Sequence, residues 1–239
     1  MPDRGLGLTP AAAARDNEFA FIIIAMARPR SDDKRRRILQ AAVKVFARKG
    51  YFAARVSDIA KHAGVADGTI YLYFRGKEDI LVSLFDELMS EHVRRARAEM
   101  ETVADAPSRL RLLAEHHLRA LGADRDLAVV FQVELRQSTK FMERFTASWL
   151  GRYFDLVSSV IEQGQREGTL RPELPVRLVT KAFFGTLDEL VTSWVVGRKD
   201  YDLGLLAAPA VDLLLRGAAP AVASTPARRP LAVVGRGGR

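Results

Sequence analysis

The sequence predicts an all-α fold, in which a small three-helix head is followed by a larger helical body. From Asp32 onward, apolar side chains recur with a period near 3.6 residues, which is the spacing of one helix face. Glycine and proline interrupt this pattern repeatedly, as they do between successive helices. We find neither the strict alternation that marks a half-buried strand nor an internal repeat.

The first helix of the head is predicted to run from about Asp32 to Gly50. Ser31, Asp32 and Asp33 offer a cap and first-turn acids, and Gly50 suits the position just after the last turn. The predicted inner face consists of apolar residues spaced for one side of a helix: Ile38, Ala41, Ala42, Val45 and Phe46.

Two short helices are expected next, at about 57–63 and 68–74, joined near Gly64. We expect a positive φ at Gly64, because the chain turns sharply there. Ala60 is small enough for the helices to cross closely, and Asp67 is placed to cap the second one. Their common core is expected to contain Val56, Ile59, Val65 and Ile70. Two short helices joined by a tight glycine turn form the helix-turn-helix unit that binds DNA.

The body is predicted to begin with one long helix, from Lys77 to about Met100. Its inner face is expected to contain Ile80, Leu81, Leu84, Phe85 and Leu88. Further helices are expected near 107–121, 126–137, 141–167, 175–197 and 202–216. The helix 141–167 carries a wide apolar face that includes Phe141, Phe145 and Trp149, and the helix 175–197 carries another.

The two ends of the chain differ in composition from the rest, which suggests four segments. These are an N-terminal extension (1–27), a DNA-binding head (28–76), a ligand-binding and dimerisation body (77–216) and a disordered tail (217–239). The apolar run 19–26 resembles a signal peptide, but Asp16 and Glu18 stand where positive charge is expected. We favour a natural start at Met26, and the run is too short to span a membrane.

The net charge of +8 is concentrated in the predicted head. Between Arg28 and Glu78 there are 13 Lys and Arg against 5 Asp and Glu, whereas 79–216 is slightly acidic. Such a patch suits a partner rich in phosphates, although basic runs are often only solvated surface. The chain has no cysteine, which excludes disulfides and thiolate zinc sites and suits the reducing cytoplasm.

The second short helix would enter the major groove of operator DNA with its N-terminal end. Gly68 permits close approach of the backbone, and Thr69 can meet a phosphate or a thymine methyl group. Tyr71 and Tyr73 can donate to phosphates, although both could instead be core residues. The full set of predicted DNA contacts is Lys34, Ser57, Asp67, Gly68, Thr69, Tyr71, Tyr73 and Lys77.

An enzyme is not expected, because no glycine-rich phosphate loop, nucleophile elbow or zinc-protease helix occurs. Glu115, His116 and His117 are adjacent on one helix, so their side chains diverge and cannot converge on a metal ion. No cofactor or metal is therefore predicted. An architectural DNA-binding protein without a ligand is the other alternative, but it would need little beyond the basic head.

The stretch 64–81, GVADGTIYLYFRGKEDIL, strongly resembles the signature of the TetR family, as does the preceding segment from Arg37 with Phe46, Gly50 and Tyr51. The resemblance covers about 33–82. It implies a cytoplasmic homodimer that binds double-stranded operator DNA and has a ligand-binding body. In this family the last two helices usually form the dimer, which fits 175–216.

A second resemblance concerns the ligand. The blocks 67–74, 134–138 and 185–195 are similar to the FadR-type TetR regulators of fatty-acid degradation, which bind long-chain acyl-coenzyme A. It implies a repressor that acyl-coenzyme A releases from DNA; a TetR regulator of another hydrophobic effector, such as a drug or a metabolite, is the alternative. The predicted ligand-binding residues are Leu112, Leu113, Val130, Phe131, Arg136, Phe183, Phe184 and Leu187. Further candidate partners of the coenzyme A phosphates are Arg94, Arg95, Arg97, Arg109 and Arg119.

Overall fold

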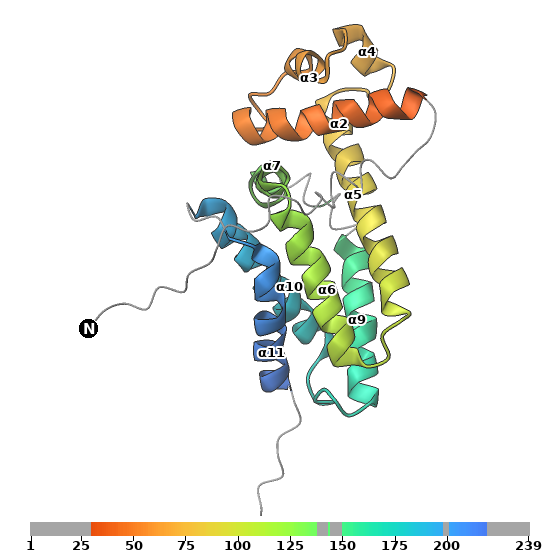
Figure 1. Cartoon of the computed structure of the whole chain (residues 1–239), viewed down its shortest axis with the longest axis vertical. Coiled ribbons are helices and arrows are strands. Elements are labelled where there is room, and N and C mark those ends of the chain that lie inside the picture. The colour runs from red at the N-terminus through yellow and green to blue at the C-terminus, as the bar shows by residue number, and fades with distance from the viewer. Residues whose placement is uncertain (1–29, 138–142, 144–149, 198–200, 219–239) are drawn as a thin grey trace, which may run out of the picture.

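The computed structural model describes residues 30–137, 143, 150–197 and 201–218. The head comprises α2 (Arg30–Lys49), α3 (Val56–Ala63) and α4 (Asp67–Tyr71), and it lies across one end of an elongated body (Figure 1). Helix α5 (Lys77–Met100) runs from the head down the side of the body, so it belongs to both parts (Figure 1). The described residues form helices and turns without any strand, as predicted.

The head is built around the predicted inner face of α2. All five of its apolar residues are buried, and Ile59 of α3 and Ile70 of α4 are fully buried against them. Gly50 ends α2 with φ 78° and Gly64 ends α3 with φ 65°, both in the left-handed region expected for glycine. The Arg37 guanidinium donates to the carbonyl oxygen of Ala63 at 2.6 Å, which ties the end of α3 to α2.

Helix α4 is shorter than the predicted helix 68–74, and Asp67 does not cap it. The N-cap position is occupied by Ala66, and no side-chain cap hydrogen bond is made there. Asp67 instead lies in the first turn, where its negative charge interacts favourably with the helix dipole. Beyond Tyr71 the next two N–H groups donate to carbonyls three residues back, and this tighter turn leads to buried Phe74.

The body is a bundle of helices around α6 (Ala106–Gly122). Against α6 pack α5, α9 (Gly151–Arg166), α10 (Val176–Val196) and α11 (Ala207–Ala218), the last preceded by the short 3₁₀ turn η4 (Leu203–Leu206). The predicted inner face of α5 is confirmed, because all five of its residues are buried.

The helix predicted at 126–137 forms, but with three different pitches. It begins as α7 (Arg125–Val129), widens to the π-helix η1 (Val130–Glu134) and tightens to the 3₁₀ turn η2 (Leu135–Gln137). Gln132 and Glu134 are both buried although they are two residues apart and point to nearly opposite sides. The segment therefore lies between two buried environments. Wide helical turns of this kind are frequent at functional sites.

The two cores of the molecule meet at this segment. Leu127, Val130 and Leu135 belong to the core of the head, together with the first half of α5. Ala128 belongs to the core of the body, and half-buried Phe131 packs against both. Head and body are therefore joined by packed side chains as well as by the continuous helix α5.

Several expectations fall outside the described residues. These are the extension 1–27, the tail beyond Ala218, and the residues Phe141, Phe145 and Trp149 of the predicted helix 141–167. Within the ranges that the structure describes, no helix is both long and apolar enough to span a membrane.

Candidate functional site

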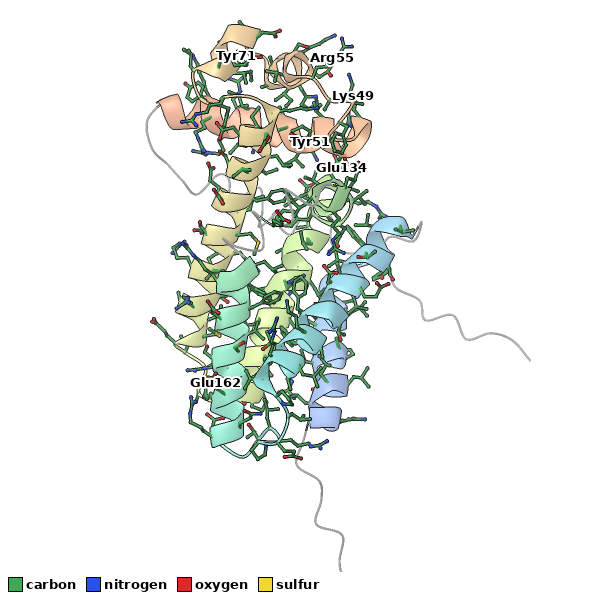
Figure 2. All side chains as sticks on the ribbon, turned by 180° about the vertical axis from the view of Figure 1, so that it is seen from behind. Lys49, Tyr51, Arg55, Tyr71, Glu134 and Glu162 are labelled. Carbon is green, nitrogen blue, oxygen red and sulfur yellow. The ribbon has the colours of Figure 1, made fainter. Side chains whose placement is uncertain are left out.

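The predicted DNA contacts lie on the head, mostly on its outer side. Tyr71 stands at the far end of the molecule (Figure 2), and 60% of its surface is exposed. A side chain at Gly68 would meet no atom within 4 Å, so the backbone there is open to a close partner. Lys34, Ser57 and Asp67 are exposed as well. Thr69 is half-buried, and Tyr73 is half-buried against the head core.

Basic side chains surround this outer side of the head. Arg48, Arg55 and Lys61 are exposed, and each is close in sequence to α3 or within it. Lys49 is also exposed and lies 2.7 Å from Asp58, an ion pair that keeps the pKa of this carboxyl below its usual value. Figure 2 shows Lys49 and Arg55 on the same side of the head. The concentration of positive charge deduced from the sequence is therefore a surface property of the folded head.

Lys77 was predicted to contact a phosphate, but in the structure its side chain binds the protein backbone. Its ammonium group donates to the carbonyl oxygens of Tyr51 and Phe52, both at 2.9 Å, and of Ala54 at 3.1 Å. It also lies 4.7 Å from the centre of the Tyr51 ring. Three carbonyls satisfy the three N–H donors of a lysine, so Lys77 fixes the loop between α2 and α3 to the start of α5.

The variant Lys77→Met is expected to lower the free energy of unfolding by about 2–3 kcal/mol, because three carbonyls lose a charged donor that is only partly exposed. Urea unfolding followed by circular dichroism measures this. Lys61→Met removes the same charge from an exposed position and is expected to change stability by less than about 0.5 kcal/mol. If the two variants were equally stable, the three hydrogen bonds of Lys77 would not stabilise the fold, and its predicted role as a phosphate contact would be favoured.

A largely apolar pocket of about 100 Å³ lies at the junction of head and body. Its wall comes from α5, α6, the segment 127–136, α9 and α10, so every part that meets at the junction contributes to it. The lining residues that matter most below are Leu88, His92, His117, Phe131, Tyr153 and Phe184. Leu88 and Leu127 belong both to the pocket wall and to the head core, so the pocket directly adjoins that core.

One side of the pocket carries a network of polar groups. The half-exposed guanidinium of Arg136 lies 2.6 Å from the Asp188 carboxylate of α10. The amide of Gln132 donates to the same carboxylate at 3.1 Å, and Thr192 donates to the Gln132 amide oxygen at 3.2 Å. Arg136 is the exposed end of this network, and Gln132 is its buried end.

The other polar groups of the pocket are deeply buried. Burial lowers the pKa of His117 to about 4, against a smaller opposing effect of Asp188, and lowers that of His92 to about 3. Both imidazoles are therefore neutral at pH 7. Burial also raises the pKa of Tyr153, whose ring is 1% exposed. Among the described residues, the buried Tyr153 hydroxyl and His117 Nε2 have no hydrogen-bond partner.

Three of the eight predicted ligand-binding residues line this pocket: Phe131, Arg136 and Phe184. Phe184 and Asp188 lie one helical turn apart and face the pocket, whereas Phe183 and Leu187 occupy the neighbouring face of α10 and belong to the body core. Phe183 also borders a second apolar cavity, between α9, α10 and α11.

The remaining predicted ligand contacts point elsewhere. Leu113 is fully buried in the body core, half-buried Leu112 packs against that core, and Val130 faces the head core. His92, His117 and Tyr153 also line the pocket and were not predicted to do so. Polar side chains that interrupt an apolar helix face were the available signal for these three, because such positions need a polar partner.

Most of the arginines suggested as phosphate partners already have partners. Arg94 and Arg95 both pair with Glu91 at 2.6 Å. Arg119 lies 3.6 Å from Glu115. Arg109 donates to Gln163 at 2.6 Å. Arg97 is exposed and, like these, does not line the pocket, so of the arginines considered only Arg136 does.

The segment that lines the pocket is also bonded to the head. Glu134 is 5% exposed, and its carboxylate accepts a hydrogen bond of 2.6 Å from the backbone N–H of Tyr51, in the loop between α2 and α3. Figure 2 shows the two residues facing each other across the junction. Nearby, Lys44 of α2 lies 3.1 Å from Asp126 and 3.5 Å from Asp124. The wall of the pocket is therefore joined to the head by polar contacts as well as by packing.

Two family models match adjacent parts of the chain. Residues 38–84 match the model of bacterial regulatory proteins, tetR family, and residues 85–217 match that of the YsiA-like protein, C-terminal region. A fatty acid metabolism regulator protein from Bacillus subtilis is 42% identical over 180 residues, which are 75% of this chain and 93% of the relative.

Solved structures resemble this one closely. The fatty acid degradation regulator FadR from Bacillus halodurans is 45% identical, with a TM-score of 0.74 that covers 77% of this chain and 95% of the other. FadR from Bacillus subtilis in complex with stearoyl-CoA is 42% identical, with a TM-score of 0.72 and coverage of 76% and 97%. These relatives are regulators. The chain therefore belongs to the TetR family of bacterial regulatory proteins.

Proposed function

We propose that this protein is a repressor of fatty-acid degradation genes that long-chain acyl-coenzyme A releases from operator DNA. The main support is the position of the apolar pocket, which shares Leu88 and Leu127 with the core of the DNA-binding head. Similarity to regulators of fatty-acid metabolism, one of them solved with stearoyl-CoA, supports the choice of effector. The effector would be a regulatory ligand, and the proposal requires no cofactor.

The size of the pocket suggests how the ligand would act. About 100 Å³ is well below the roughly 300–1,000 Å³ usual for small-molecule sites, so a long acyl chain has to move the pocket wall apart. The wall includes Leu88 and His92 of α5 and Phe131 of η1. Displacing α5 and η1 would change the position of the head, since both are packed into it or bonded to it.

The DNA complex is proposed to contain two copies of the chain. A dimer would place two α4 helices in successive major grooves, about 34–36 Å apart. Helices α10 and α11 suit the dimer contact because they expose large apolar side chains, including Leu178 with 59% and Leu213 with 71% of its surface exposed. Acting on operator DNA would place the protein in the cytoplasm.

The test is a titration of purified protein on a labelled fragment of its own promoter region at fixed salt, with and without palmitoyl-coenzyme A. We expect specific binding that the acyl-coenzyme A weakens by about 5–150-fold, the usual range of allosteric coupling. Free coenzyme A and acetyl-coenzyme A are the controls, and neither is expected to release DNA because neither fills an apolar pocket.

Specific binding that ignores palmitoyl-coenzyme A would contradict the proposed effector and favour a different hydrophobic ligand, because the pocket is largely apolar. Equal affinity for unrelated DNA fragments would contradict the proposal of a specific repressor, since regulators prefer their operators by about 10³–10⁷-fold.

A further inference from the structure

Resting on the proposed function, we propose that Tyr153 and His117 bind the carbonyl oxygen of the acyl thioester. Tyr153 lies on α9 and His117 on α6, and both line the pocket at the junction of head and body. Their ring centroids are 5.9 Å apart. Phe184 of α10 is within 5.9 Å of His117 and 6.1 Å of Tyr153, so the three rings surround one part of the pocket.

Neither polar atom is used by a described residue. The Tyr153 hydroxyl and His117 Nε2 are buried and have no hydrogen-bond partner among the described residues. A buried polar group without a partner costs about 1–3 kcal/mol, so such pairs are rare unless another molecule completes them. The apolar surroundings leave these two atoms as the points that fix the orientation of a ligand.

The chemistry of the pair matches a neutral carbonyl. A tyrosine hydroxyl and a neutral imidazole each donate one hydrogen bond, and a carbonyl oxygen accepts two. A carboxylate would fit less well, because no cation lies in this part of the pocket wall that the structure describes and Asp188 acts electrostatically on His117. The thioester is the neutral carbonyl group of an acyl-coenzyme A.

The position of Tyr153 and His117 along the pocket also suits the thioester group of an acyl-coenzyme A. Phe184 and Asp188 are one helical turn apart on α10, about 6 Å along its axis. Arg136, paired with Asp188, is the exposed end of the pocket, so it can face the polar coenzyme A portion outside. The thioester would then lie one turn deeper, beside His117 and Tyr153, and the acyl chain would enter the apolar remainder near Leu88 and Phe131.

The test compares palmitoyl-coenzyme A with S-hexadecyl-coenzyme A, a thioether of the same chain length without the carbonyl group, by isothermal titration calorimetry. Wild-type protein is expected to bind the thioester about tenfold more tightly, which is the gain in affinity expected from one or two buried hydrogen bonds. Tyr153→Phe is expected to reduce this preference to about threefold, because the hydroxyl that it removes acts only on the thioester carbonyl. In the double variant Tyr153→Phe, His117→Phe, we expect no preference.

Tyr201→Phe is the matched control, because Tyr201 is exposed and does not line the pocket. It is expected to keep the wild-type preference. Equal affinity of the wild type for both probes, or an unchanged preference in Tyr153→Phe, would overturn the assignment of the carbonyl to this pair. Failure of the wild type to bind either probe would instead overturn the proposed effector.

Discussion

Replacement of Tyr71 by alanine is expected to weaken operator binding by at least about thirtyfold while leaving acyl-coenzyme A affinity unchanged. The side chain is 60% exposed at the far end of the head, away from the pocket. A hydrogen bond to a charged phosphate is worth about 1.5–3 kcal/mol, and a dimer would lose two of them. Fluorescence anisotropy with labelled operator measures the first effect, and calorimetry with palmitoyl-coenzyme A measures the second.

Tyr71→Phe separates the hydroxyl from the ring. If the hydroxyl donates to a phosphate, this variant reproduces most of the loss seen with alanine. Tyr201→Ala removes another exposed tyrosine from the body and is expected to leave DNA affinity unchanged. A parallel fall in ligand affinity with Tyr71→Ala would show that Tyr71 supports the fold and would exclude it as a DNA contact.

Glu134→Ala is expected to uncouple the ligand from DNA. The carboxylate of Glu134 joins the wall segment of the pocket to the Tyr51 N–H in the head, and alanine removes this bond. We therefore expect unchanged palmitoyl-coenzyme A binding, but release of operator DNA that falls below about fivefold. Loss of a buried hydrogen bond to a charged acceptor should also lower the free energy of unfolding by about 1–3 kcal/mol.

Two further variants show whether this effect belongs to the bond itself. Glu134→Gln keeps an oxygen acceptor for the Tyr51 N–H and is expected to retain most of the release. Glu162→Ala removes an exposed carboxylate low in the body, far from the junction (Figure 2), and is expected to behave as wild type. Full release in Glu134→Ala would contradict the proposed route and leave the packing of Leu127, Val130 and Leu135 as the connection.

The head illustrates which features can be predicted from local sequence. The spacing of apolar residues predicted the buried face of α2, and the positive φ of Gly64 followed from the need for a tight turn. Asp67 was wrong as a cap, because the start of a five-residue helix can shift by one residue at little cost. The carbonyl partners of Lys77 could not be predicted, because they lie 23 to 26 residues away in sequence.

The pocket illustrates the opposite case. Apolar composition indicated a ligand-binding body, but Phe183 and Phe184 look equivalent in sequence although only Phe184 faces the pocket. Likewise, nothing local to Tyr153 or His117 shows that the two residues line one pocket. The sequence shows which residues share a helix face, but not how the helix is rotated about its axis. That rotation is set by neighbours that are distant in the chain.

The sequence by itself determined the family, the all-helical fold and the position of the DNA-binding unit, because these depend on local spacing, turn chemistry and a contiguous charged segment. Only the tertiary structure decided where the pocket lies, which polar atoms it contains and how Glu134 ties it to the head. These features arise where five separate segments meet, and long-range packing sets their relative orientation.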